Sequence, residues 1–147
     1  MNVCNLVDKY SKTNLILHKY RDSSMKYEEL IRKSDALASY IINHSIGNKL
    51  PIIICGHKEH LMLVCFRACN KSGHIYLPID SSTPKERIKD IAKNSNAQMI
   101  FNVSKNNLHL DNVDVKNCED IKIIINSNIK IISNRRYRVK FDINKEA

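Results

Sequence analysis

The chain has 147 residues and a mass of 17.0 kDa, which predicts one domain, and its 43% hydrophobic content is enough for a buried core. No run of about 18 apolar residues occurs, so we predict no membrane span. The first residues lack a basic stretch followed by an apolar one, which predicts no signal peptide and a cytoplasmic location.

The formal net charge of +9 would suit a polyanionic partner. The lysines are spread along the whole chain, however, and the abundance of Lys, Ile and Asn indicates a biased coding composition. The one tight basic cluster consists of Arg135, Arg136, Arg138 and Lys140. We therefore predict no nucleic-acid partner.

The five cysteines are odd in number and form no CxxC motif, so a disulfide framework is not indicated. Cys55, Cys65 and Cys69 lie inside apolar runs, which predicts buried free thiols in a reducing compartment. The remaining two are Cys4 and Cys118.

Taken in chain order, the first pattern predicts a short amphipathic helix over residues 2–11. Residues 14–20 are predicted to form a strand, residues 22–24 a turn, and residues 25–27 a brief returning strand. The clearest helix follows over residues 27–44, because one apolar stripe runs along it opposite a charged face. Ser34 lies inside that stripe, and the Gly-Asn pair at 47–48 is typical of a helix end.

The next segments predict a strand, a helix and a second strand. Residues 51–55 form a continuous apolar run, which is typical of a strand buried on both faces of a parallel sheet. Residues 59–72 have little polar face and predict a largely buried helix, and Gly73 suits its left-handed cap position. A strand is expected over residues 75–77, ended by Pro78.

A strong helix start follows. Thr83 can cap, Pro84 fits the first helical position, and Glu86 completes a capping box. Along this helix the side chains expected to face the core are Ile88, Ile91 and Ala92. Residues 98–103 predict another strand.

The alternation of strands and helices predicts a layered, Rossmann-like α/β fold with a mainly parallel sheet. After Ser104 the pattern weakens, and we predict strands over residues 121–125 and 129–132. Residues 133–147 form a polar, basic tail. Because the two predicted strands are sparsely charged, we expect them to be aggregation hazards and the isolated chain to be marginally soluble.

No segment predicts a complete active site. The three glycines, Gly47, Gly56 and Gly73, are far apart, so the chain contains neither a G-x-G-x-x-G motif nor a Walker loop, and no nucleotide site is predicted for it alone. His57 and His60 do not have a usual zinc spacing, even with Glu59 between them and Cys55 nearby, so no metal site is predicted.

The remaining candidates for chemistry are cysteines, a histidine and carboxylates. Cys65 and Cys69 lie one helical turn apart and are interpreted as an inert core pair, because no activating base is placed near them. His74 could donate a hydrogen bond to a ligand, although local packing and capping is the simpler interpretation. We assign no catalytic role to the isolated carboxylates, which are Asp80, Asp90, Asp111 and Asp114.

The segment at 71–80, Lys-Ser-Gly-His-Ile-Tyr-Leu-Pro-Ile-Asp, resembles the second core motif of the adenylate-forming enzymes, roughly KAGxAYxPxD. The helix predicted from residue 27 begins with Tyr-Glu-Glu-Leu, and this spacing of tyrosine and leucine also resembles that superfamily. His74, the two serines after Asp80, and the segments 34–38 and 54–57 resemble the branch of D-alanine:carrier-protein ligases. The resemblance covers about residues 1–103, and more loosely the rest.

This resemblance implies an N-terminal portion of an AMP-binding domain, spanning residues 1–147 and ending before the family's Ser/Thr/Gly-rich ATP loop. The intact enzyme would use ATP and Mg²⁺ to form D-alanyl-adenylate, and would pass the D-alanyl group to the phosphopantetheine thiol of an acidic carrier protein for teichoic acid D-alanylation. No catalytic, cofactor-binding or metal-binding residue is carried over to this chain, which is expected to be inactive alone. The alternatives are another amino-acid- or acyl-adenylating enzyme, or a non-catalytic interaction module.

Overall fold

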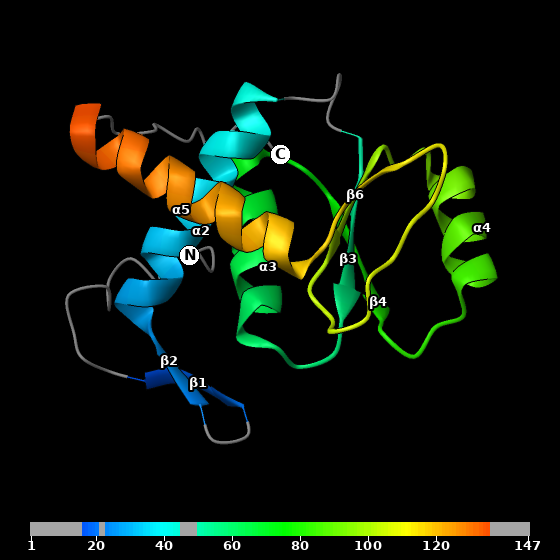
Figure 1. The fold of residues 1–147 in the computed structure, drawn as a ribbon, viewed down its shortest axis with the longest axis horizontal. Helices are drawn as coiled ribbons and strands as arrows, with labels where there is room; N and C mark the ends of the chain where they lie inside the picture. Colours follow the sequence, from blue (N-terminus) through cyan, green and yellow to red (C-terminus); the bar gives the residue numbers. More distant parts are fainter. Residues whose placement is uncertain (1–15, 21–22, 45–49, 136–147) are drawn as a thin grey trace.

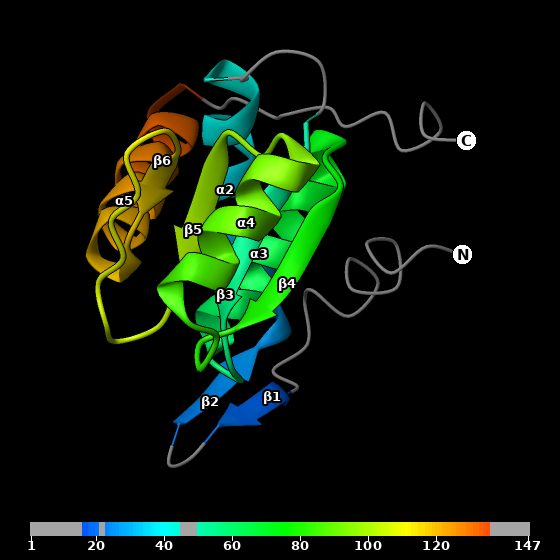
Figure 2. The same cartoon turned by 90° about the vertical axis from the view of Figure 1, so that its right-hand side faces the viewer.

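The computed structural model describes residues 16–20, 23–44 and 50–135, so the helix predicted over residues 2–11 and the Gly-Asn pair at 47–48 lie outside the described residues. The centre of the fold is a four-stranded parallel sheet (Figure 1), and its strand order is β4-β3-β5-β6 (Figure 2). Its strands are β3 (Ile52–Gly56), β4 (Tyr76–Asp80), β5 (Met99–Asn102) and β6 (Asp114–Lys116). The predicted α/β class with a mainly parallel sheet is confirmed.

Helices cover both faces of this sheet. On one face lie α2 (Tyr27–Asn43), α3 (His60–Ser72) and α5 (Cys118–Arg135), and on the other lies α4 (Lys85–Ser95) (Figures 1 and 2). A separate antiparallel hairpin of β1 (Ile16–Tyr20) and β2 (Ser23–Lys26) leads into α2. Within the described ranges, none of the helices is both long and apolar enough to cross a bilayer.

Strand β3 carries side chains into two separate cores. Ile52 and Ile54 pack in the larger core with α2, α3 and α5, whereas Ile53 and Cys55 pack in the smaller core with α4. Successive strand residues point to opposite faces, so this alternation follows from the pleat. All five residues of β3 are buried, which confirms the strand predicted from the continuous apolar run.

The connection from α3 to β4 is a left-handed cap. Gly73 has a φ of 80°, a conformation that costs glycine little, and His74 N donates to Cys69 O at 2.9 Å. Tyr76, the first residue of β4, then stacks on Phe66 of α3 with 4.7 Å between the ring centroids. The predicted cap at Gly73 is confirmed, and it turns the chain directly from the buried helix into the sheet.

Pro78 does not end this strand, and that prediction was wrong. It lies in the middle of β4, opposite Ile54. Just before β4, Ile75 O accepts from Ile52 N at 2.9 Å, and just after it Ser81 N donates to Gly56 O at 2.8 Å, so the backbone of the odd-numbered residues from 75 to 81 faces β3. Pro78 falls between them and directs its nitrogen to the open edge, where a missing N–H costs no ladder bond.

The capping box predicted at the start of α4 is also absent. The helix begins at Lys85 after Pro84, with no side-chain hydrogen bond at the cap. Thr83 N instead donates to Asp80 O at 3.0 Å and closes the turn that leaves β4, which shifts the helix start by one residue. Ile88 and Ala92 are buried and Ile91 packs beside them, as predicted for the core face of this helix.

The largest error concerns residues 118–135, which form helix α5 and not two strands. Ile121 and Ile125 are buried one turn apart in the larger core, and Ile124 and Ile129 pack beside them. The isoleucines therefore recur at helical spacing, and packing against α2 outweighs their local β-propensity. The helix start is also stabilised locally, because Asn117 N donates to Asp120 Oδ2 at 3.0 Å. The solubility expectation that relied on these strands loses its basis.

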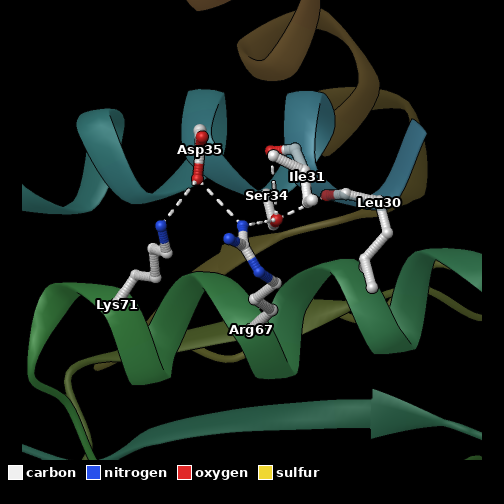
Figure 3. Close-up of polar contacts among 6 residues, drawn as sticks. All are labelled: Leu30, Ile31, Ser34, Asp35, Arg67 and Lys71. Carbon is white, nitrogen blue, oxygen red and sulfur yellow. Dashed lines mark hydrogen bonds and ion pairs between the residues drawn. The ribbon is translucent and has the colours of Figure 1, made fainter. Parts of the chain in front are cut away.

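A charged cluster joins α2 to α3 (Figure 3). Arg67 is only 5% exposed, and its Nη1 donates to Asp35 Oδ1 at 2.8 Å and to Ser34 Oγ at 2.6 Å. Lys71 Nζ lies 3.6 Å from the same carboxylate oxygen. The Ser34 hydroxyl in turn donates to Leu30 O and to Ile31 O. This explains the serine inside the apolar stripe, because it contacts a buried guanidinium.

We predict that Asp35→Ala lowers the free energy of unfolding by about 1–3 kcal/mol, because the buried Arg67 guanidinium loses its carboxylate. The matched control is Glu29→Ala on the same helix, whose carboxylate pairs with Lys33 at the surface and should contribute less than about 0.5 kcal/mol. Urea unfolding measures both. Equal effects of the two substitutions would refute the buried-charge explanation.

The helical assignment of α5 predicts unequal effects for two isoleucines. Ile121 is 0% exposed and Ile123 is 64% exposed. We expect Ile121→Ala to lower the free energy of unfolding by about 2–4 kcal/mol and Ile123→Ala to change it by less than about 0.5 kcal/mol. In a strand the two side chains would share one face, so similar losses in chemical denaturation would favour the strand.

Candidate functional site

The carboxyl ends of three parallel strands meet at one edge of the sheet. Gly56 ends β3 beside Asp80 of β4, and Asn102 ends β5 beside Cys55. Two further backbone bonds extend this edge, since Ser81 N donates to Gly56 O at 2.8 Å and Val103 N donates to Cys55 O at 2.9 Å. Ligands of open parallel sheets bind at such an edge, so these residues define the candidate site.

The histidine that follows β3 and the aspartate that ends β4 lie together at this edge. His57 Nδ1 is 3.0 Å from Asp80 Oδ1, and Ser82 donates to the other Asp80 oxygen through its N–H at 2.9 Å and through its hydroxyl. The Ser82 hydrogen bonds, followed by His57, lower the pKa of Asp80 to about 2. Asp80 is therefore a carboxylate at neutral pH that holds the turn into α4, and it is not poised to donate a proton.

Gly56 is required here for space. A Cβ at this position would lie 2.5 Å from Val103 Cγ2 and 3.1 Å from Glu59 Oε1. Because Gly56 has no side chain, the chain can leave the end of β3 while its backbone packs closely against Val103, which follows β5. His57 N donates to that same Glu59 carboxylate, which stabilises the turn.

Asn102 organises the loop that follows β5. Its side chain is 1% exposed and donates to Asn106 O and to Asn117 Oδ1, both at 2.8 Å. The side chain of Asn117 forms two hydrogen bonds with the backbone of Leu108. Its Oδ1 accepts from Leu108 N at 2.9 Å, and its Nδ2 donates to Leu108 O at 3.1 Å. These bonds hold residues 103–108 over the carboxyl edge. Neither Asn102 nor Asn117 was predicted from the sequence as a site residue. The signal that could have identified Asn102 is an amide side chain at the end of a buried strand.

A pocket of about 150 Å³ lies between this loop and the start of α4. Its lining combines the apolar side chains of Ile88 and Leu108 with hydroxyl, amide and amine groups that can hydrogen-bond a small polar or anionic group. The polar groups belong to Ser81, Thr83, Lys85, Asn102, Ser104, Asn106 and Asn107. Cys55 also lines it, but burial, then Asp80 and Glu59, raise the pKa of its thiol. The thiol is protonated at neutral pH, so Cys55 is not an activated nucleophile.

The other thiols and His74 considered from the sequence are structural. Cys65 and Cys69 are fully buried, and desolvation raises the pKa of both thiols, which agrees with the predicted core pair. Cys55 and Cys118 are free thiols as well. His74 is buried, and its Nδ1 lies 3.0 Å from Leu50 O, so it tethers the start of β3 and faces no ligand pocket at the carboxyl edge.

The remaining candidates do not converge on the carboxyl edge. Asp111 lies 3.5 Å from His109 Nε2 and Asp114 lies 3.3 Å from Lys116 Nζ, both pairs being in the 109–116 segment. Asp90 is exposed on α4. Among the residues that the structure describes, no three His, Cys, Asp or Glu side chains gather in a way that could hold a metal ion.

The chain resembles known proteins in sequence and in fold. The AMP-binding enzyme family matches residues 7–139. A D-alanine–D-alanyl carrier protein ligase of Bacillus anthracis is 36% identical over 104 residues, which covers 69% of this chain and 21% of the relative. The chain thus spans about a fifth of the length of this curated relative.

Solved structures show the same fold at low sequence identity. The artificially fused adenylation–PCP di-domain NpsA-ThdA from Klebsiella oxytoca superposes with a TM-score of 0.75 at 15% identity, covering 96% of this chain and 26% of that one. The N-terminal subdomain of Klebsiella oxytoca NpsA superposes with a TM-score of 0.73 at 15% identity, covering 96% of this chain and 34% of that one. Because the family matches most of the sequence and the fold agrees, the chain belongs to the AMP-binding enzyme family.

Proposed function

We propose that residues 1–147 form the N-terminal portion of the AMP-binding domain of a D-alanine-activating ligase. The intact enzyme would join D-alanine to ATP with Mg²⁺, release pyrophosphate, and transfer the D-alanyl group from the adenylate to a carrier-protein phosphopantetheine thiol. The observation that carries this proposal is the 36% identity to the Bacillus ligase over 104 residues. We further propose a cytoplasmic enzyme that serves teichoic acid D-alanylation.

The junction between α3 and β4 supports this assignment to a subdomain. Gly73 caps α3, Tyr76 stacks on Phe66, and Asp80 reaches the carboxyl edge beside Gly56. These residues include the segment that resembles the second core motif of adenylate-forming enzymes. They build and orient the sheet edge, and the pocket beside it offers hydrogen-bond donors and a protonated Cys55 thiol. This portion therefore contributes framework, and the reacting groups would belong to the rest of the enzyme.

Two alternatives remain, one from another branch of the adenylating enzymes and one from a different class of protein. Another amino-acid- or acyl-adenylating enzyme would share the fold and the junction, as the likeness to the NpsA subdomain illustrates. A non-catalytic interaction module would keep the fold alone. The closed cores on both faces of the sheet favour independent folding of this unit, which an interaction module would need.

We predict that the purified 147-residue chain shows no D-alanine-dependent exchange of pyrophosphate into ATP, because residues 1–147 contain no Ser/Thr/Gly-rich loop of the kind that the resemblance implies for ATP binding. The Bacillus anthracis ligase assayed in parallel is the positive control. Exchange by the pure chain above the rate without D-alanine would show that an active site is present and would overturn this division of roles.

A chimera tests whether this chain is equivalent to the ligase framework. In it, residues of this chain replace the aligned segment of the Bacillus anthracis ligase. We expect D-alanine-dependent exchange within about tenfold of the parent, with L-alanine as the comparison substrate, because the replaced segment supplies framework. A chimera that unfolds cooperatively but shows no exchange would contradict the proposal.

A further inference from the structure

A groove lies at the opposite end of the sheet from the carboxyl edge. It runs between the C-terminal half of α4 and residues 110–113, and its volume is about 660 Å³. Gln98, the residue before β5, lines it, so the groove opens at the amino ends of the strands. Its size lies within the range of pockets that hold small organic ligands.

The groove has an apolar floor and a polar rim. Ala92, Ala97 and Leu110 form the floor, and they are 3%, 6% and 6% exposed. Lys89 and Lys93 lie one helical turn apart on the same face of α4 and form one side of the rim. Amide side chains that can donate hydrogen bonds complete the rim, namely Asn96, Gln98 and Asn112.

Neither Lys89 nor Lys93 forms an ion pair with another residue of the described ranges. The acidic residue that lines the groove is Asp111, whose side chain is 93% exposed and lies 3.5 Å from His109 Nε2. The C-terminal dipole of α4 offsets part of the charge of Lys93, whereas Lys89 lies a turn farther from the helix end. The rim therefore carries a net positive charge above an apolar floor.

We propose that this groove binds a small organic anion, with its apolar body against Ala92, Ala97 and Leu110 and its carboxylate or phosphate group held by Lys89 and Lys93. Gln98 and Asn112 would hydrogen-bond the polar atoms of the ligand. The groove shares no residue with the carboxyl edge, so this inference and the proposed ligase activity stand or fall separately.

The first test is a titration of the ¹⁵N-labelled 147-residue chain followed by NMR. The probes are benzoate, phenyl phosphate and benzamide, which share one ring and differ in the attached group. We expect the side-chain amide signals of Asn96, Gln98 and Asn112 to shift, and the preferred anion to bind about tenfold tighter than neutral benzamide. Comparison of benzoate with phenyl phosphate identifies the preferred anionic group.

Paired variants then test the lysines. K89Q/K93Q should remove the preference for the anions over benzamide, whereas the charge-matched control K26Q/K130Q, at exposed positions outside the groove, should keep it. Circular dichroism verifies that both variants are folded. Equal binding of benzamide and the anions, an unchanged preference in K89Q/K93Q, or no shift of the three amide signals would each overturn the proposal.

Discussion

Strand β3 is paired on both edges and buried on both faces, and most of the fold follows from that one constraint. Its edges pair with β4 and β5, so neither is open to solvent. Its faces must each be covered by apolar side chains, which α2, α3 and α5 supply on one side and α4 on the other. Because the strands of this sheet are parallel, the turns that connect them to the helices lie at the two ends of the sheet. The pocket at the carboxyl edge and the groove at the amino ends of the strands lie among these turns.

The elements predicted correctly are those whose signals are local. The continuous apolar run of β3 (Ile52–Gly56), the amphipathic stripe of α2 and the glycine after α3 each determine a structure through nearby residues. Helix α5 was missed because its isoleucines favour strands locally. Their helical spacing becomes decisive only when Ile121 and Ile125 have a helix layer to pack against. Pro78 was misjudged for a related reason, because its tolerance depends on β4 being an edge strand.

The polar contacts between the helices and at the site could be predicted least. Arg67 and Asp35 lie on different helices, and their contact depends on how α2 and α3 pack. The serine within the stripe of α2 was the only local sign of that pair. Asn102 and Asn117 likewise meet across the loop after β5, at a distance of 15 residues along the chain. Such contacts link segments far apart in sequence, so neither periodicity nor composition reveals them.

The proposed framework role of this chain agrees with the chemistry of its carboxyl edge. The carboxyl edge has a paired carboxylate, a protonated thiol and hydrogen-bond donors, which suit the support of a ligand more than its transformation. Under this proposal, the reacting groups of the enzyme lie outside residues 1–147. That expectation agrees with the share of the Bacillus ligase that the chain covers.

The central claim is that these residues are the N-terminal portion of a D-alanine-activating ligase. The most direct measurement is the sequence of the native transcript beyond codon 147, read in all three frames. The account predicts a Ser/Thr/Gly-rich loop of the form TSGSTG within a few tens of codons in one frame. A stop codon followed by unrelated sequence in every frame would contradict it and would favour the stand-alone interaction module.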